Sequence, residues 1–141
     1  MLPFSELDLA TWRKNVEVHL DGTFYVTKEC LDARLESGRG HVVNMASVAA
    51  RQAFAGNVAY CATKFGLRGF SDALRLDLAP KGIRVTTVYP GPTDTTIFEG
   101  VPGDWDPASM NRPEDVAEVV WQAWSAPPDA DVADLDGPPP S

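Results

Sequence analysis

The fold is decided by the stretch Ile83-Arg84-Val85-Thr86-Thr87-Val88-Tyr89, in which β-branched residues predominate. Such a run predicts a β-strand, and Pro90-Gly91 ends it. A shorter β-rich run at 41–46 predicts an earlier strand, and residues 57–79 between the two predict a helix. Strand, helix and strand with short connections form a βαβ unit. We therefore expect an α/β fold with a parallel sheet covered by helices.

The helix expected over 57–79 begins at Asn57, a favourable N-cap residue, and ends before Pro80. Its apolar residues form two stripes, and two stripes predict burial on two sides. One stripe contains Leu67, Phe70, Leu74 and Leu78, and the other contains Ala62, Phe65, Gly69 and Ala73.

Nearer the N-terminus, a long helix is expected over 9–36, with Ser5 and Asp8 as alternative N-caps and glycines at 38 and 40 ending it. Apolar residues at spacings of three and four predict one buried face. This face is expected to contain Trp12, Val16, Leu20, Phe24, Thr27 and Leu31.

The region after the second strand begins with residues 92–111, which are rich in Gly, Pro and Asp and predict a surface loop. Pro113 opens a third helix that ends before Pro127-Pro128, and a short edge strand is expected around 132–135. We expect one domain over 1–136 and a disordered tail over 137–141. The buried face of the third helix is expected to contain Val116, Val119, Val120 and Ala123.

The chain has 141 residues, of which 44% are apolar and 23% charged. This balance predicts a globular domain. No apolar run approaches the roughly 20 residues that a membrane-spanning helix needs, so no membrane partner is expected. The first residues have no basic segment leading into an apolar stretch. We therefore expect a cytoplasmic protein.

The formal net charge of −8 belongs almost entirely to the C-terminal region. Seven acidic residues and no Lys or Arg follow Pro113, whereas residues 1–112 hold the other 13 acidic residues and all 12 basic ones. Without a basic stripe, nucleic acid is not expected as a partner. Cys30 and Cys61 are too few and too far apart for a metal site, so no metal is expected and both are predicted to be buried.

Candidate functional groups lie where parallel sheets bind ligands, beyond the carboxyl ends of the strands. Ser47 follows the first strand, and the turn at 90–95 follows the second. Tyr60 and Lys64 are four residues apart and share one side of the helix. A phenol ordinarily loses its proton near pH ~10, and a nearby ammonium favours the phenolate, so this pair is a candidate acid and base. Alone, such a pair more often lies on a solvated helix face.

Taken together and in order, these motifs resemble the short-chain dehydrogenase/reductase family. The resemblance runs from about residue 7 to residue 135 and is greatest to its NADP-linked hydroxy-acid and carbonyl reductases. Ser47 and Tyr60 stand 13 residues apart, a separation typical of that family. The resemblance implies the C-terminal half of a doubly wound, parallel-sheet Rossmann-type fold. It rests on Asn44-Met45-Ala46-Ser47, on Tyr60 with Lys64, and on Pro90-Gly91 with Thr95.

The resemblance also implies an oxidoreductase that moves a hydride between NAD or NADP and a small-molecule ketone or secondary alcohol. Tyr60 would donate the proton to the carbonyl, Lys64 would favour the phenolate and bind the nicotinamide ribose, and Ser47 would orient the substrate oxygen. The loop at 96–111 matches the family's substrate lid. The nicotinamide would be held by Tyr60, Lys64, Pro90, Gly91, Thr93 and Thr95.

Two departures from the family pattern bear on activity. His19 stands where the family has an asparagine that supports a proton-relay water; an imidazole can also serve a relay, and the alternative is a packed helix residue. The glycine-rich strand, turn and helix that receive the pyrophosphate are missing from the sequence. We therefore expect an incomplete cofactor site and a truncated chain that needs a complementing N-terminal half.

Two functions stay open. The chain is either the catalytic half of such an enzyme or a catalytically inactive fragment that acts as an oligomerising or interaction module. The resemblance implies a homo-oligomer through the helices at 9–36 and 57–79, and the open edge of the strand with Val42 and Val43 also predicts association. A hydrolase using Ser47 is disfavoured, because neither a G-x-S-x-G motif nor an acid–histidine pair accompanies it.

Overall fold

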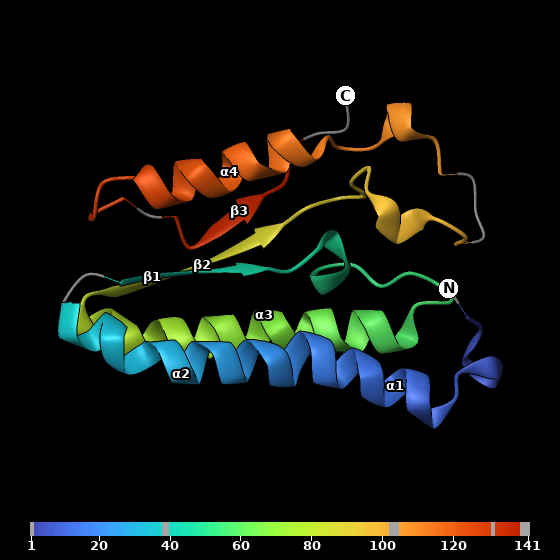
Figure 1. The fold of residues 1–141 in the computed structure, drawn as a ribbon, viewed down its shortest axis with the longest axis horizontal. Helices are drawn as coiled ribbons and strands as arrows, with labels where there is room; N and C mark the ends of the chain where they lie inside the picture. The colour runs from blue at the N-terminus through green and yellow to red at the C-terminus, as the bar shows by residue number, and fades with distance from the viewer. Residues whose placement is uncertain (1, 38–39, 102–104, 131, 139–141) are drawn as a thin grey trace.

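The computed structural model describes residues 2–37, 40–101, 105–130 and 132–138, which form helices around a parallel sheet (Figure 1). The strands lie in the order β1-β2-β3, and both pairs are parallel. The expected α/β fold is therefore confirmed. In chain order the elements are α1 (Leu9–Val16), α2 (Gly22–Ser37), β1 (Gly40–Met45), α3 (Val58–Leu78), β2 (Ile83–Tyr89), α4 (Pro113–Ser125) and β3 (Asp134–Asp136).

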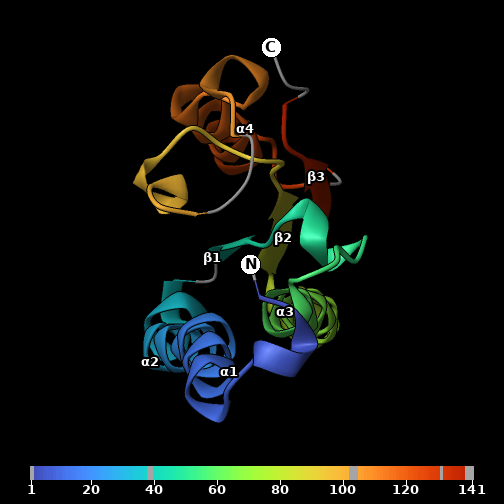
Figure 2. The same cartoon turned by 90° about the vertical axis from the view of Figure 1, so that its right-hand side faces the viewer.

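The sheet lies between two unequal layers of helices (Figure 2). α1, α2 and α3 lie side by side on one face of the sheet, and α4 covers the other face. Because β1 and β2 are parallel and in register from Gly40 with Ile83 to Met45 with Val88, their carboxyl ends meet at one end of the molecule. That end carries most of the candidate functional residues.

β2 is the best-buried strand because it has a strand on each side and helices on both faces. Its residues 85–89 are all buried, and Ile83 and Val85 pack against Leu78 of α3. Burying side chains of this size contributes roughly 1.5–3 kcal/mol each. The bounds of β2 are those predicted from its β-branched residues.

α3 follows the predicted helix to within one residue at each end. A short turn ends it at Gly82, whose φ of 73° is a left-handed conformation that favours glycine. The stripe with Leu67 and Leu78 is buried. The prediction of burial on two sides was wrong, because no element of the described chain covers the opposite side of α3. The residues left exposed there are Ala62, Phe65, Gly69 and Ala73.

The N-terminal helix has the predicted extent, and four of the six residues of its predicted face are half-buried: Val16, Leu20, Thr27 and Leu31. A π-helical turn, Glu17–Asp21, interrupts it between α1 and α2. Trp12 and Phe24 are 37% and 49% exposed, so their predicted burial was wrong. The half-buried polar residues of this helix recur every four positions, whereas an α-helical turn contains about 3.6 residues. A π turn contains more residues than an α-helical turn, so it helps to keep these positions on one side of the helix. These residues are Thr11, Asn15, His19, Thr23 and Thr27.

The C-terminal segment is bonded to the sheet through its acidic residues. Asp134 accepts a hydrogen bond from the Tyr89 hydroxyl at 2.6 Å, and Asp136 pairs with Arg51. The Arg51 guanidinium also lies 3.7 Å above the centre of the Tyr89 ring. Two of the C-terminal acidic residues, Asp134 and Asp136, thus attach β3 to the rest of the fold. Of the tail expected at 137–141, residues 139–141 lie outside the described residues, as do the glycine at 38 and residues 102–104 of the expected lid.

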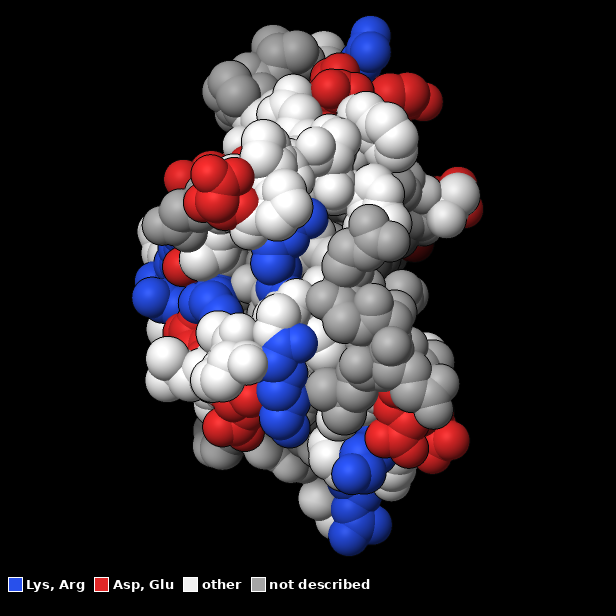
Figure 3. Space-filling view, turned by 90° about the vertical axis from the view of Figure 1, so that its left-hand side faces the viewer, with Lys and Arg blue, Asp and Glu red and all other residues white. Residues whose placement is uncertain are grey.

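α4 spans the predicted third helix and buries Val116 and Ala123 against the sheet. At the end of the molecule where this helix finishes, Lys and Arg side chains form a broken line with Asp and Glu on either side (Figure 3). Cys61 is buried as expected, but Cys30 of α2 is exposed, because it faces a groove beside β1. Among the described residues, no helix is both long and apolar enough to cross a membrane.

Candidate active site

A cleft of about 860 Å³ opens at the carboxyl ends of β1 and β2. Ser47, Tyr60 and the turn at 90–95 line it, so the structure brings these predicted residues together. His19 and Lys64 do not line this cleft. They line a second cavity of about 610 Å³, which runs between β1 and α2 and which we call the edge groove.

Ser47 is held where β1 turns away from the sheet. The amide of Ala46 donates to the Val88 carbonyl at 2.8 Å, and the amide of Val48 donates to the Pro90 carbonyl at 3.0 Å. The Ser47 hydroxyl oxygen accepts a hydrogen bond from the Ala49 amide at 3.1 Å and so caps a short 3₁₀ turn. The O–H proton is left to donate, which suits a group that orients a substrate oxygen.

The turn that follows β2 is fixed from two sides. Asn111 donates its backbone N–H to the Pro92 carbonyl and accepts from the Asp94 amide, both at 2.9 Å. On the other side, Gly137 donates to the Tyr89 carbonyl at 3.1 Å, and a β-carbon on Gly137 would lie only 2.7 Å from the Pro90 α-carbon. Sequence reasoning missed both residues, because a single Asn and a single Gly in loop segments carry no pattern.

Within this turn, Thr93 donates its hydroxyl to the Gly91 carbonyl at 3.1 Å, and Thr95 donates to the Thr93 carbonyl at 3.4 Å. Asn111 is 3% exposed, and its side-chain oxygen is buried with no hydrogen-bond partner in the described chain. Asn111 does not itself line the cleft, but the turn that it fixes does, through Gly91, Thr93 and Thr95. A turn with a small residue and two hydroxyl groups at the cleft fits the nicotinamide end of the implied cofactor.

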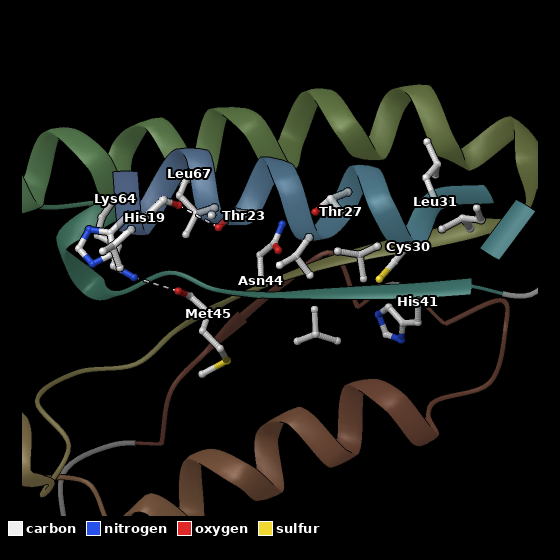
Figure 4. Close-up of a pocket in the computed structure, with 16 residues that line it drawn as sticks. His19, Thr23, Thr27, Cys30, Leu31, His41, Asn44, Met45, Lys64 and Leu67 are labelled. Carbon is white, nitrogen blue, oxygen red and sulfur yellow. Dashed lines mark hydrogen bonds between the residues drawn. The ribbon is translucent and has the colours of Figure 1, made fainter. Parts of the chain in front are cut away.

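Lys64 projects from α3 into the edge groove and donates from Nζ to the Met45 carbonyl at 3.0 Å (Figure 4). Its side chain is buried, and this burial lowers the pKa of Lys64 to about 8. The Nζ atom lies 5.6 Å from the centre of the Tyr60 ring. A cation at this distance favours a negative charge on the ring oxygen.

His19 lies in the π turn and packs edge-on against Tyr60, with the ring centres 5.4 Å apart. Its Nδ1 atom is 2.9 Å from the Thr63 hydroxyl, which itself donates to the Tyr60 carbonyl. Because a hydroxyl has one proton, Nδ1 must carry the proton in this bond, and Nε2 is left as an acceptor. Burial, and then the charge of Lys64, lower the pKa of His19 below its ordinary value of 6.5, so the ring is neutral near pH 7.

The Tyr60 ring thus has both predicted partners beside it, His19 and Lys64, and it also lines the cleft that contains Ser47. Tyr60 therefore lies between the cleft and the edge groove and borders both groups of predicted site residues. Thr63 was not anticipated as a partner of His19. The four-residue polar spacing from Thr11 to Thr27 is the signal that points to His19 as inward-facing.

The chain matches the family model described as short chain dehydrogenase over residues 1–104. A 3-alpha-(or 20-beta)-hydroxysteroid dehydrogenase of Mycobacterium tuberculosis is 34% identical over 114 residues, which are 79% of this chain and 43% of that protein. An uncharacterised oxidoreductase of Staphylococcus aureus is 30% identical over 126 residues, which are 88% of this chain and 53% of that protein. The chain thus spans about half the length of the curated relatives it matches.

Solved structures agree in fold over nearly the whole chain. Serine dehydrogenase from Escherichia coli matches with a TM-score of 0.81 and 31% identity, over 96% of this chain and 56% of that one. A serine dehydrogenase in complex with NADP+ matches with a TM-score of 0.83 and 26% identity, over 96% of this chain and 58% of that one. The fold described above is therefore that of a Rossmann-like part of these larger chains.

Proposed function

The chain belongs to the short-chain dehydrogenase family, and from this premise we propose that it supplies the proton-transfer site of an NAD(P)-dependent oxidoreductase that interconverts a ketone and a secondary alcohol. The observation that carries the proposal is the position of Tyr60, which lines the cleft on one side and contacts His19 and faces Lys64 on the other.

In the reducing direction, the substrate oxygen binds between the hydroxyl groups of Ser47 and Tyr60. Tyr60 gives its proton to that oxygen and becomes a phenolate, which the Lys64 ammonium stabilises electrostatically. Nε2 of the Nδ1-protonated His19 is placed to accept a hydrogen bond from a water molecule, and that water would give the replacement proton to the Tyr60 phenolate and take one from solvent. In the oxidising direction each proton moves the opposite way.

The turn at 90–95 would hold the nicotinamide, with Lys64 near its ribose. When bound, a reduced nicotinamide supplies the hydride that converts the carbonyl carbon to a carbinol carbon, and is itself oxidised. The sequence contains no glycine-rich strand–turn–helix for the pyrophosphate. We therefore propose that NAD or NADP binds tightly only with a complementing N-terminal half, and that the reaction takes place in the cytoplasm.

The test is to mix the chain with a separately produced N-terminal segment that carries such a glycine-rich unit, and to follow NADPH and NADH consumption with ketones. We expect carbonyl reduction by the mixture, and a loss of about 10²-fold or more for Tyr60→Phe because the proton donor is gone. Tyr25→Phe is the matched control, since Tyr25 is 62% exposed on α2. Equal rates for the two variants would contradict the assignment of Tyr60.

A second candidate function is an interaction module without catalysis. The exposed stripe on α3 favours it, because Phe65 is 43% exposed beside Ala62 and Gly69 on a side that no described element covers. This function predicts that the mixture forms a complex and stays inactive toward every ketone offered. Recovered reduction that depends on Tyr60 would exclude it.

A further inference from the structure

The cleft beside Ser47 and Tyr60 is apolar over most of its lining. The apolar side chains come from the N-terminal segment, from the loop before α3 and from the segment after β2. Several are open to solvent: Phe54 and Val58 are each 42% exposed, and Ile97 is 70% exposed. Phe98 and Trp105 pack together with ring centres 4.5 Å apart and form one wall.

None of the described residues that line the cleft carries a charge. Two basic residues close in sequence to the lining residues, Lys64 and Arg51, are engaged elsewhere. Lys64 binds the Met45 carbonyl in the edge groove, and Arg51 pairs with Asp136 and stacks on Tyr89. The polar residues of the lining are Ser47, Tyr60, Thr93 and Thr95, with Thr11 and Asn15 from α1 and Asn57 from the loop before α3.

Charge decides which substrates this cleft accepts. A carboxylate that enters it loses water and finds no cation or bidentate guanidinium to replace that water, which disfavours hydroxy acids and amino acids. A neutral ring system or alkyl body instead removes the exposed apolar side chains from water, which favours binding. The cleft of about 860 Å³ has room for a bulky substrate body beside a nicotinamide ring at the turn at 90–95.

We propose that the substrate is a neutral ketone or secondary alcohol with a bulky apolar body, whose oxygen binds at Ser47 and Tyr60 and whose body packs on Phe54, Ile97 and the Phe98–Trp105 wall. This inference rests on the proposed function for the identity of the reacting group. It names specificity residues that the sequence motifs do not contain. It also favours the carbonyl-reductase side of the family resemblance over the hydroxy-acid side.

The test measures binding to the chain itself, without cofactor, by equilibrium dialysis. The probes are 2-decalone, a neutral bicyclic ketone, and decahydro-2-naphthoate, which has the same ring body with a carboxylate. We expect the ketone to bind at least about tenfold more tightly. Equal or tighter binding of the carboxylate, or no binding of the ketone, would overturn the proposal.

Two variants and a control locate the binding. Phe54→Ala should weaken ketone binding severalfold, and Phe54→Arg should bring carboxylate affinity up to that of the ketone or above it, because it adds the missing cation. Trp121→Ala is the matched control, since Trp121 is 60% exposed on α4 and does not line the cleft. If Phe54→Ala binds the ketone as Trp121→Ala does, the proposal is wrong; circular dichroism checks that each variant is folded.

The outcome is separable from that of the proposed function. If the ketone binds as expected but the complemented protein never reduces it, the cleft assignment stands and the oxidoreductase proposal fails. If the complemented protein reduces keto acids through Tyr60 while decalone does not bind, the reverse holds.

Discussion

At the scale of single residues, His41 carries the sharpest consequence for stability. It is 8% exposed, stacks on Trp124 and donates from Nε2 to the Thr86 hydroxyl at 2.7 Å, since that hydroxyl gives its own proton to the Val132 carbonyl. Its Nδ1 atom is buried without a partner in the described chain. Burial, and then the charge of Arg84, lower the pKa of His41 to about 4.

A lowered histidine pKa makes the protein less stable in acid. Above pH 6.5 the ring is neutral in both the folded and the unfolded chain; as the pH falls toward 4, only the unfolded chain takes up the proton. We expect the free energy of unfolding to fall by on the order of 3 kcal/mol across this window, at about 1.4 kcal/mol per pKa unit. Urea unfolding of the wild type and of His41→Gln at several pH values checks this. If both lose equal stability between pH 6.5 and 4, His41 is not the cause.

Some of the site residues could be predicted from their spacing in the sequence, and the contacts of others could not. Ser47, Tyr60 and Lys64 could be picked out because a fixed spacing after a strand and along a helix places them near one strand end. Which cavity each side chain faces could not be predicted: Lys64 faces the edge groove because the open side of β1 leaves the Met45 carbonyl within its reach. The bond between His19 and Thr63 joins positions 44 apart and depends on how α3 packs against the π turn.

At the scale of elements, two glycines in different surroundings should respond oppositely to alanine. Gly137 has no room for a β-carbon beside Pro90, so Gly137→Ala must displace the end of β3 or the turn, at a cost of about 1–3 kcal/mol. Gly69 is in the middle of α3 with nothing within 4 Å of a new β-carbon in the single chain, so Gly69→Ala should stabilise the monomer, at protein concentrations too low for association, by about 0.5–1 kcal/mol.

Chemical denaturation of both variants measures the difference. A Gly137→Ala protein as stable as wild type would show that the turn adjusts freely, and a destabilised Gly69→Ala protein would show that another surface packs on that side of α3. Strand and helix bounds were predictable because β-branched runs, N-caps and glycines act locally. On the N-terminal helix the pattern predicted the inward positions of Leu20, Thr27 and Leu31, but it did not predict the exposure of Trp12 and Phe24.

At the scale of the whole molecule, one edge of the sheet and one side of the helical layer are exposed to solvent. The open edge expected for the strand with Val42 and Val43 is confirmed, because the sheet places β1 at an edge, with the edge groove beside it. The helical layer of α1, α2 and α3 covers one face of the sheet (Figure 2). Several apolar side chains of these helices are exposed, among them Phe24, Val26 and Phe65. The stripe on α3 with Ala62, Phe65, Gly69 and Ala73 is exposed in the described chain and is therefore available for contact with a partner.

We therefore expect the isolated chain to associate through α3. Burying a phenylalanine in a contact contributes roughly 1.5–3 kcal/mol, and Phe65 is 43% exposed among small residues that permit close helix approach. Sedimentation velocity should show dimers or larger species for the wild type, and Phe65→Glu should shift the chain toward monomer because its charge would be buried without a partner. Trp121→Glu, on α4 across the sheet, should leave association unchanged. A monomeric wild type would refute the expectation, and association that persists in Phe65→Glu would assign it to the open edge of β1 instead, where backbone groups, not side chains, make the contact.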